Sequence, residues 1–169
     1  MYFLKLKYEV FETLNIWKAL VENQSGKNIK ILRNDNGKEY VNKNLQHLCE
    51  ECGIQMQHSI PYTPQQNGVV ERKNRALKAM ATCMIEAKDL SPKIWYEAIN
   101  FNVYIYNRYS HKYVKGKTRY EAWFGHKPNI SHFRYFGSRA WAQIPLEKRK
   151  ELHPQRKECI MVGVGCYNV

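Results

Sequence analysis

The spacing of hydrophobic and polar residues along the chain predicts alternating helices and strands. From Glu9 to about Asn23, apolar residues recur every three or four positions, which is the period of a helix with one buried face. A similar stripe covers residues 43–52. The segments 27–35 and 54–60 are short, rich in isoleucine, leucine and methionine, and typical of strands in a core. Residues 2–6 have the pattern of the end of a further strand.

The pattern changes after residue 60. Two prolines and a glycine interrupt residues 61–68, which predicts a mobile loop. A long helix is expected from Val70 to about Ala87, and Ser91 followed by Pro92 predicts the start of another helix. Near the end of the sequence, SRAWAQIP and ECIMVGV indicate two more strands. This order of elements is that of an α/β fold.

Positive charge is concentrated in the second part of the chain. The 169 residues include 27 Lys and Arg against 15 Asp and Glu, a net charge of +12. Residues 1–70 carry a net charge of +1, and residues 71–169 carry +11. Such a surplus attracts polyanions, so we expect the second part to contact nucleic acid. No apolar run reaches the ~20 residues that a membrane helix needs, so we expect no membrane partner.

Five cysteines indicate a reducing, intracellular environment, because their number is odd and their spacing is irregular. Cys49 and Cys52 form a CxxC within a predicted helix, which places them one turn apart on the same side as Leu45 and Leu48. No second CxxC or pair of histidines follows at the spacing of a zinc finger. We therefore interpret the pair as part of a packed helix face, with a metal site as the alternative.

Two carboxylates stand at the ends of predicted elements. Asp35 ends a strand, Glu71 opens the long helix, and 35 residues separate them. Two converging carboxylates can hold Mg²⁺ through oxygen ligands, and such ions promote phosphoryl transfer. Taken alone, the simpler explanation is a turn residue and an acid in the first turn of a helix.

The sequences around these carboxylates change that assessment. ILRNDNGKEY and PYTPQQNGVVERKNRAL resemble the catalytic core of retroviral and retrotransposon integrases, particularly that of copia-type LTR retrotransposon Pol polyproteins. The resemblance continues through IWYEAINFNVYIYNR and KECIMVGV and covers nearly the whole chain. It implies an RNase H-like core, lacking its first strands, in residues 1–110. A basic, aromatic-rich connector would follow in residues 111–137, and the start of a small SH3-like β module in residues 138–169.

The resemblance also implies roles for single residues. Asp35 matches the second aspartate, and Glu71 the glutamate, of an Asp, Asp, Glu triad that binds Mg²⁺ or Mn²⁺ in this family. The implied DNA-binding positions are Tyr62, Gln66, Asn67, Arg75 and Lys78, the first three of them in the active-site loop. Helical geometry agrees for the last two, because at ~100° per residue positions 71, 75 and 78 fall within about 60° of one another.

The triad is incomplete in these 169 residues. The family's first catalytic aspartate lies on the opening strand of the sheet, whereas this sequence contains two aspartates, Asp35 and Asp89. The acids before Asp35 are Glu9, Glu12 and Glu22, all in the predicted first helix. We therefore expect the chain alone to lack strand-transfer activity, and whether it is an enzyme stays open.

The leading hypothesis is an integrase-type core fragment involved in DNA integration, whose family performs metal-dependent 3′-end processing and strand transfer. One alternative is a catalytically dead module that binds nucleic acid. Another is a module that pairs with a full-length integrase. The expected partners are DNA and either a second copy of the chain or a full-length integrase. The resemblance places the protein in the nucleus or in a retrotransposon particle.

Overall fold

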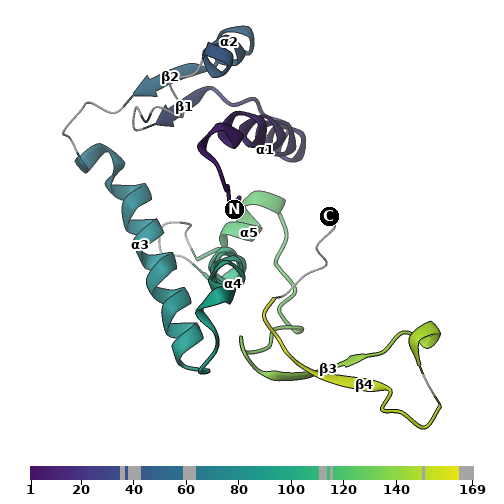
Figure 1. The fold of residues 1–169 in the computed structure, drawn as a ribbon. Coiled ribbons are helices and arrows are strands. Elements are labelled where there is room, and N and C mark those ends of the chain that lie inside the picture. The colour runs from purple at the N-terminus through teal and green to yellow at the C-terminus, as the bar shows by residue number, and fades with distance from the viewer. Residues whose placement is uncertain are drawn as a thin grey trace. The chain divides into compact units, whose positions relative to one another are not determined.

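The computed structural model describes residues 1–34, 37, 43–58, 64–110, 114, 116–149 and 151–163. The chain forms two compact units, Met1–Asn74 and Arg75–Val169, whose helices and strands are drawn in Figure 1. The long helix α3 begins in the first unit and ends in the second. Each unit has its own buried residues and is described separately.

The first unit alternates helices and strands as the sequence pattern predicts. Its elements are η1 (Lys7–Glu9), α1 (Val10–Ser25), β1 (Ile31–Asn34), α2 (Lys43–Glu51), β2 (Gln55–His58) and the start of α3 (Pro64–Glu86). Helix α1 ends at Gly26, whose left-handed φ of 63° lets its N–H donate to the Glu22 carbonyl at 2.9 Å. The predicted helix over residues 9–23 is therefore confirmed, and Gly26 ends it.

Strands β1 and β2 form a parallel pair in which Ile31 lies opposite Gln55 and Asn34 opposite His58. Leu45 and Cys49 of α2 are buried together with Ile54, which precedes β2. Apolar side chains from α1, α2, both strands and the segment before β1 pack against this cluster: Phe11, Leu14, Ile29, Leu32, Leu48 and Met56. Because parallel strands end at the same edge of a sheet, this core holds the ends of β1 and β2 together.

The second unit consists of the rest of α3 and elements from η2 onward. These are η2 (Pro92–Ile94), α4 (Trp95–Arg108), α5 (Arg119–Phe124), β3 (Arg139–Gln143), η4 (Leu146–Lys148) and β4 (Arg156–Ile160). The Ser91 side chain accepts a hydrogen bond from the Lys93 N–H, as the predicted N-cap requires. Strands β3 and β4 form an antiparallel pair (Figure 1).

Helix α4 forms the centre of the second unit. Ala98, Ile99, Phe101 and Asn102 are buried on it, and the Asn102 amide donates to the Leu77 carbonyl of α3 at 3.4 Å. Farther along α4, the Arg108 guanidinium lies 3.5 Å from the ring centroid of Tyr104 and 4.7 Å from that of Tyr120 on α5. Cation–π contacts thus join α5 to α4.

Three local predictions differ from the structure. Residues 2–6 form no strand, and neither of the two sheets in the described part of the chain includes them. The expected loop over residues 61–68 is helical from Pro64 onward, because proline suits the first helical position, where its missing N–H is not needed. Helix α5 was not predicted, although Thr118 accepts a hydrogen bond from the Glu121 N–H and Gly125 ends the helix.

Candidate functional site

Glu71 lies well inside helix α3 and not in its first turn, because the helix begins at Pro64. The interpretation of Glu71 as an acid in the first turn of the helix is therefore wrong. Its side chain is exposed, and among the described residues no basic group forms an ion pair with it. The regular helix fixes the backbone at Glu71, and the exposed carboxylate oxygens are accessible to a ligand.

Arg75 and Lys78 are exposed on the next two turns of the same helix. With 3.6 residues per turn, both lie on the side of α3 that carries Glu71. Farther along the same helix, Ala81 and Ile85 are buried in the second unit and anchor it there. The structure therefore places a carboxylate and two cations along one exposed face, which we call the α3 face (Glu71, Arg75 and Lys78).

Four other predicted site residues lie wholly or partly outside the described residues. Asp35 and Tyr62 are among the residues that the structure does not describe. Gln66 and Asn67 belong to the first two turns of α3, so the prediction of a loop at these positions is wrong, and their side chains are not described. The structure therefore does not test whether Asp35 and Glu71 converge.

Asn34, the residue before Asp35, contacts the end of the neighbouring strand. Asn34 ends β1, is 5% exposed, and its Oδ1 lies 2.8 Å from Nδ1 of His58, the last residue of β2. This contact ties the ends of two parallel strands together at the edge where Asp35 follows. The sequence pattern places His58 only within the strand predicted over residues 54–60. The sequence does contain one signal for this contact, because the polar His58 falls on the same face of the predicted strand as Ile54 and Met56.

The CxxC pair does not form a metal site within the described residues, where no group of three or more His, Cys, Asp or Glu side chains is suitably placed to hold an ion. Cys49 is 3% exposed in the core of the first unit, and burial raises the pKa of its thiol. The structure supports a packed helix face for Cys49, whereas Cys52 is exposed and follows the end of α2 at Glu51, so that part of the prediction is wrong. Among the residues that the structure describes, none of the helices combines the length and the hydrophobicity of a membrane span.

No family model matches the chain. The chain is 34% identical over 165 residues to the retrovirus-related Pol polyprotein from transposon TNT 1-94 of Nicotiana tabacum, a match that covers 98% of its length. It is 31% identical over 163 residues to the corresponding polyprotein from transposon RE2 of Arabidopsis thaliana. The chain spans 12% and 11% of the lengths of these two relatives.

The fold is similar to that of a chain in the simian T-cell lymphotropic virus intasome bound to PP2A regulatory subunit B56 gamma. That match covers 90% of this chain and 52% of that chain, with a TM-score of 0.54 at 20% identity. A second similar structure is the HTLV-2 integrase catalytic core domain in complex with magnesium, in its trimeric form, with a TM-score of 0.47, 22% identity and coverage of 66% of this chain and 68% of that one. The predicted RNase H-like fold of an integrase core is confirmed, while the SH3-like module and the domain boundaries stay predictions.

Proposed function

Because the chain belongs to the family of retrovirus-related Pol polyproteins from copia-type transposons, we propose that it acts in DNA integration as an integrase-type core that binds nucleic acid. The observation that carries this proposal is the 34% identity over 98% of the chain. The charge distribution supports it, since residues 71–169 carry a net charge of +11 and surplus cations favour binding to phosphates.

DNA binding is assigned to the α3 face. Arg75 and Lys78 are exposed cations on a regular helix, so their side chains can reach phosphates beside Glu71 without displacing it. Phosphate contacts of this kind position a duplex and carry no base sequence information. Tyr62, Gln66 and Asn67 complete the proposed DNA-binding set at the start of α3 and immediately before it.

The metal assigned to the site is Mg²⁺ or Mn²⁺. The donor chemistry fits, because the exposed carboxylate of Glu71 and that of Asp35 supply the hard oxygen ligands that these ions prefer. When bound, such an ion activates a nucleophile and stabilises the charge that develops on a transferring phosphoryl group. The contribution of the chain itself is to hold Glu71 on a rigid helix and to place two cations beside it.

The 169-residue chain alone is expected to lack strand-transfer activity. Of the acids that precede Asp35, Glu9 lies in η1 and Glu12 and Glu22 lie in α1, and Glu22 is paired with Lys18 at 2.7 Å. None of these occupies a strand from which a third carboxylate would join Asp35 and Glu71. A catalytically dead nucleic-acid-binding module is therefore the second candidate function. In either case, the resemblance favours the nucleus or a retrotransposon particle as the location.

Binding of a fluorescent DNA duplex, followed by anisotropy over a series of salt concentrations, tests the proposal. The affinity should fall steeply with salt, and Arg75→Ala and Lys78→Ala should each reduce the logarithmic salt slope by about 1. Lys73→Ala is the matched control, because Lys73 is an exposed lysine on α3 about 160° around the helix from Glu71. Equal effects of all three substitutions would contradict the α3 face as the binding surface.

The same duplex distinguishes the two candidate functions. If the chain is an integrase-type core, Mg²⁺ or Mn²⁺ should strengthen DNA binding, and Glu71→Gln should remove that effect. A dead binding module should show the same salt dependence without any effect of metal. Joining of the duplex by the chain alone, abolished by Glu71→Gln, would overturn the expectation of inactivity.

A further inference from the structure

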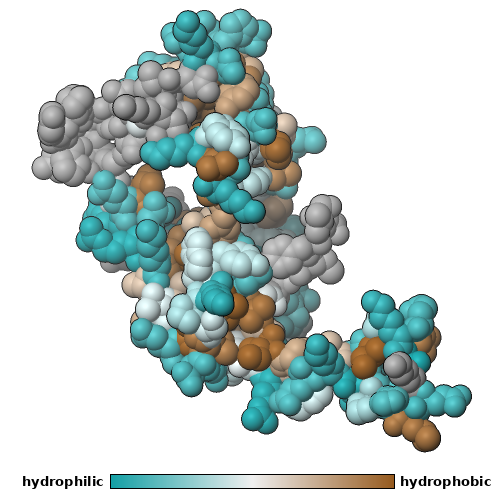
Figure 2. All heavy atoms as spheres, viewed as in Figure 1, coloured by the Kyte–Doolittle hydropathy of each residue, from teal (hydrophilic) through white to brown (hydrophobic). Residues whose placement is uncertain are grey.

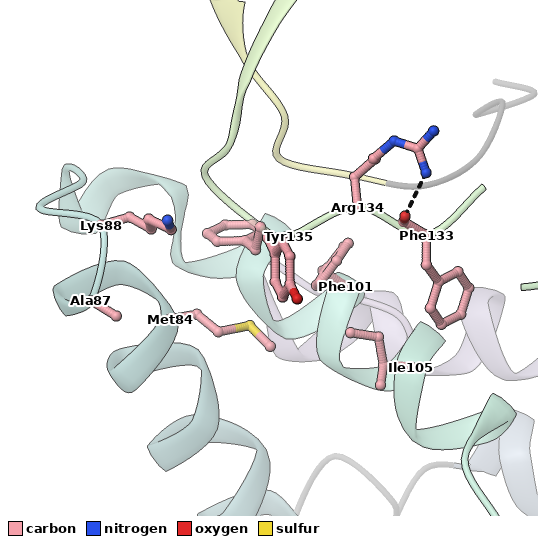
Figure 3. A pocket seen from close by; sticks show the side chains of 9 residues that line it. Met84, Ala87, Lys88, Phe101, Ile105, Phe133, Arg134 and Tyr135 are labelled. Atoms are coloured by element: carbon pink, nitrogen blue, oxygen red, sulfur yellow. Dashed lines mark hydrogen bonds between the residues drawn. The ribbon is translucent and has the colours of Figure 1, made fainter. Parts of the chain in front are cut away.

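The second unit contains an open groove of about 680 Å³ between the end of α3, helix α4 and residues 133–136. Figure 3 shows Met84 of α3 and Phe101 and Ile105 of α4 pointing toward it. In Figure 2, hydrophobic residues gather at the surface around the end of α3 that leads into α4. The groove is not part of the α3 face and has no role in the proposed function.

The floor of the groove is rigid and apolar. Phe101 is 4% exposed and Phe136 is 5% exposed, and their ring centroids lie 5.4 Å apart. Beside them, Met84 and Ile105 present only a thioether and an aliphatic chain. The residues of the floor therefore offer no polar side chain that could orient a small polar ligand.

The mouth of the groove carries an aromatic ring with little cover. Tyr135 lines the groove and is 84% exposed, whereas the next residue, Phe136, is buried. A large ring held at the mouth of an apolar groove is typical of a surface that a partner covers.

The charged residues that line the groove are both basic, Lys88 and Arg134. Arg134 is turned toward its own segment, because its guanidinium donates to the carbonyls of Phe133 at 2.8 Å and Ser131 at 3.3 Å (Figure 3). Lys88 forms no ion pair with any described carboxylate. Its stem packs closely on Gly137, where an added Cβ would lie 2.7 Å from the Lys88 Cγ. One unpaired cation is therefore held beside the apolar floor.

We propose that this groove docks a segment of a partner protein that presents apolar side chains next to acidic ones. The apolar floor would receive the hydrophobic side chains, as grooves do when they bind amphipathic helices, and Lys88 would meet an acidic residue at the edge. Charge complementarity favours such a partner over a second copy of this chain, which carries a net charge of +12. A nucleic acid fits poorly, because the floor has no groups that contact phosphates or base edges.

Methyl NMR of the full chain labelled at its methionines tests the proposal, because Met84 is the one methionine of the five that lines the groove. The probe is an amidated 14-residue peptide with leucine at helical i, i+3, i+4 and i+7 positions and glutamate elsewhere. It should shift the Met84 methyl signal in a saturable way and leave Met56, in the core of the first unit, unchanged. A peptide with lysine in place of every glutamate is the charge control and should bind at least about tenfold more weakly, equivalent to ~1.4 kcal/mol.

Two exposed substitutions locate the binding. Lys88→Glu and Tyr135→Ala should each weaken the acidic peptide severalfold, whereas Lys93→Glu, an exposed lysine that does not line the groove, should change its affinity less than twofold. Unchanged Met56 and Met161 signals confirm that each variant is folded, and if one variant fails to fold the other carries the test.

Four results would overturn the proposal. They are an unmoved Met84 signal, equal weakening by Lys88→Glu and Lys93→Glu, equal binding of the lysine peptide, and a Met84 shift caused by a DNA duplex or by raising the protein concentration without peptide. A Met84 shift caused by DNA would assign the groove to nucleic acid, and a shift caused by protein concentration would assign it to a second copy of the chain.

Discussion

At the scale of single residues, Gly137 has no room for a side chain. Its φ of +75° is unfavourable for other residues, and an added Cβ would lie 2.7 Å from Cγ and 2.9 Å from Cβ of Lys88. Because the Lys88 Cβ is fixed to the backbone, it cannot rotate away. Gly137→Ala should therefore lower the stability of the second unit by about 2–5 kcal/mol, the sum of a left-handed conformation and overpacking.

Urea unfolding measures this loss, and Gly125→Ala provides the control. Gly125 has a similar φ of +78° but nothing within 4 Å of an added Cβ, so its replacement should cost only the conformational share of about 1–2 kcal/mol. Equal losses in the two variants would show that the close contact with Lys88 contributes nothing.

Glu22 links the stability of the first unit to pH. Its carboxylate accepts hydrogen bonds from the Lys18 ammonium at 2.7 Å and from the Ile29 N–H at 2.9 Å, and these bonds lower its pKa. A lowered pKa in the folded state stabilises the fold above the unfolded-state pKa of about 4.3 and loses that contribution as the pH falls through the lower folded value. Stability should therefore decrease between mildly and strongly acidic pH.

Glu22→Gln isolates this contribution, since a neutral amide cannot titrate. Denaturation of the variant and the wild type at a series of pH values should give curves that differ at neutral pH and converge in strong acid. The exposed Glu12, on the same helix, serves as the control in Glu12→Gln. A constant difference between wild type and Glu22→Gln down to pH 2 would contradict the assigned role.

The sequence indicated single candidate site residues only where a motif of the family or the period of a helix pointed to them. Arg75 and Lys78 follow from Glu71 by the period of a helix, and the structure exposes all three. The contact between Asn34 and His58 could not be found in this way, because residues 24 positions apart meet only when two strands pair in a specific register. The metal-binding and DNA-binding roles of all the site residues stay predictions.

At the scale of elements, helices with clear local signals were predicted well. Helix α1 has an apolar stripe and a glycine stop, and α4 follows a serine cap and a proline. The loop predicted over residues 61–68 is wrong from Pro64 onward, because proline breaks the interior of a helix but is favoured at its first position. Helix α5 is six residues long, too short for an apolar period to be recognised.

Helix α5 depends on its cap. The Thr118 hydroxyl oxygen accepts from the Glu121 N–H at 2.9 Å, and the helix carries Tyr120, whose ring lies against Arg108. Thr118→Ala should destabilise α5 by about 1 kcal/mol, because the first turn loses an acceptor for one of its free N–H groups. Faster amide hydrogen exchange over residues 119–124 would report this loss.

The control for that experiment is Thr82→Ala. The Thr82 hydroxyl donates to the Lys78 carbonyl within α3 and caps no helix end, so its removal should leave exchange in α5 unchanged. If Thr118→Ala leaves the exchange of residues 119–124 as slow as in the wild type, the cap does not stabilise α5.

At the scale of the whole molecule, the chain has two units with small separate cores. Large apolar side chains remain exposed on α1, including Ile16 at 63% and Leu20 at 46%. We therefore expect thermal unfolding without a single cooperative transition, since each unit loses its own core independently. Calorimetry and circular dichroism should give transitions that do not coincide. One sharp two-state transition of a monomer would contradict this.

We propose that Asp35 and Glu71 together bind a divalent metal ion of the integrase type, and titration with Mn²⁺, followed by the paramagnetic relaxation of water, tests this pairing. We expect one saturable site in the wild type, weakened at least about tenfold, or ~1.4 kcal/mol, by either Asp35→Asn or Glu71→Gln. It should persist in Glu86→Gln, which removes an exposed carboxylate at the other end of α3. Equal Mn²⁺ binding by the wild type and all three variants would contradict the claim.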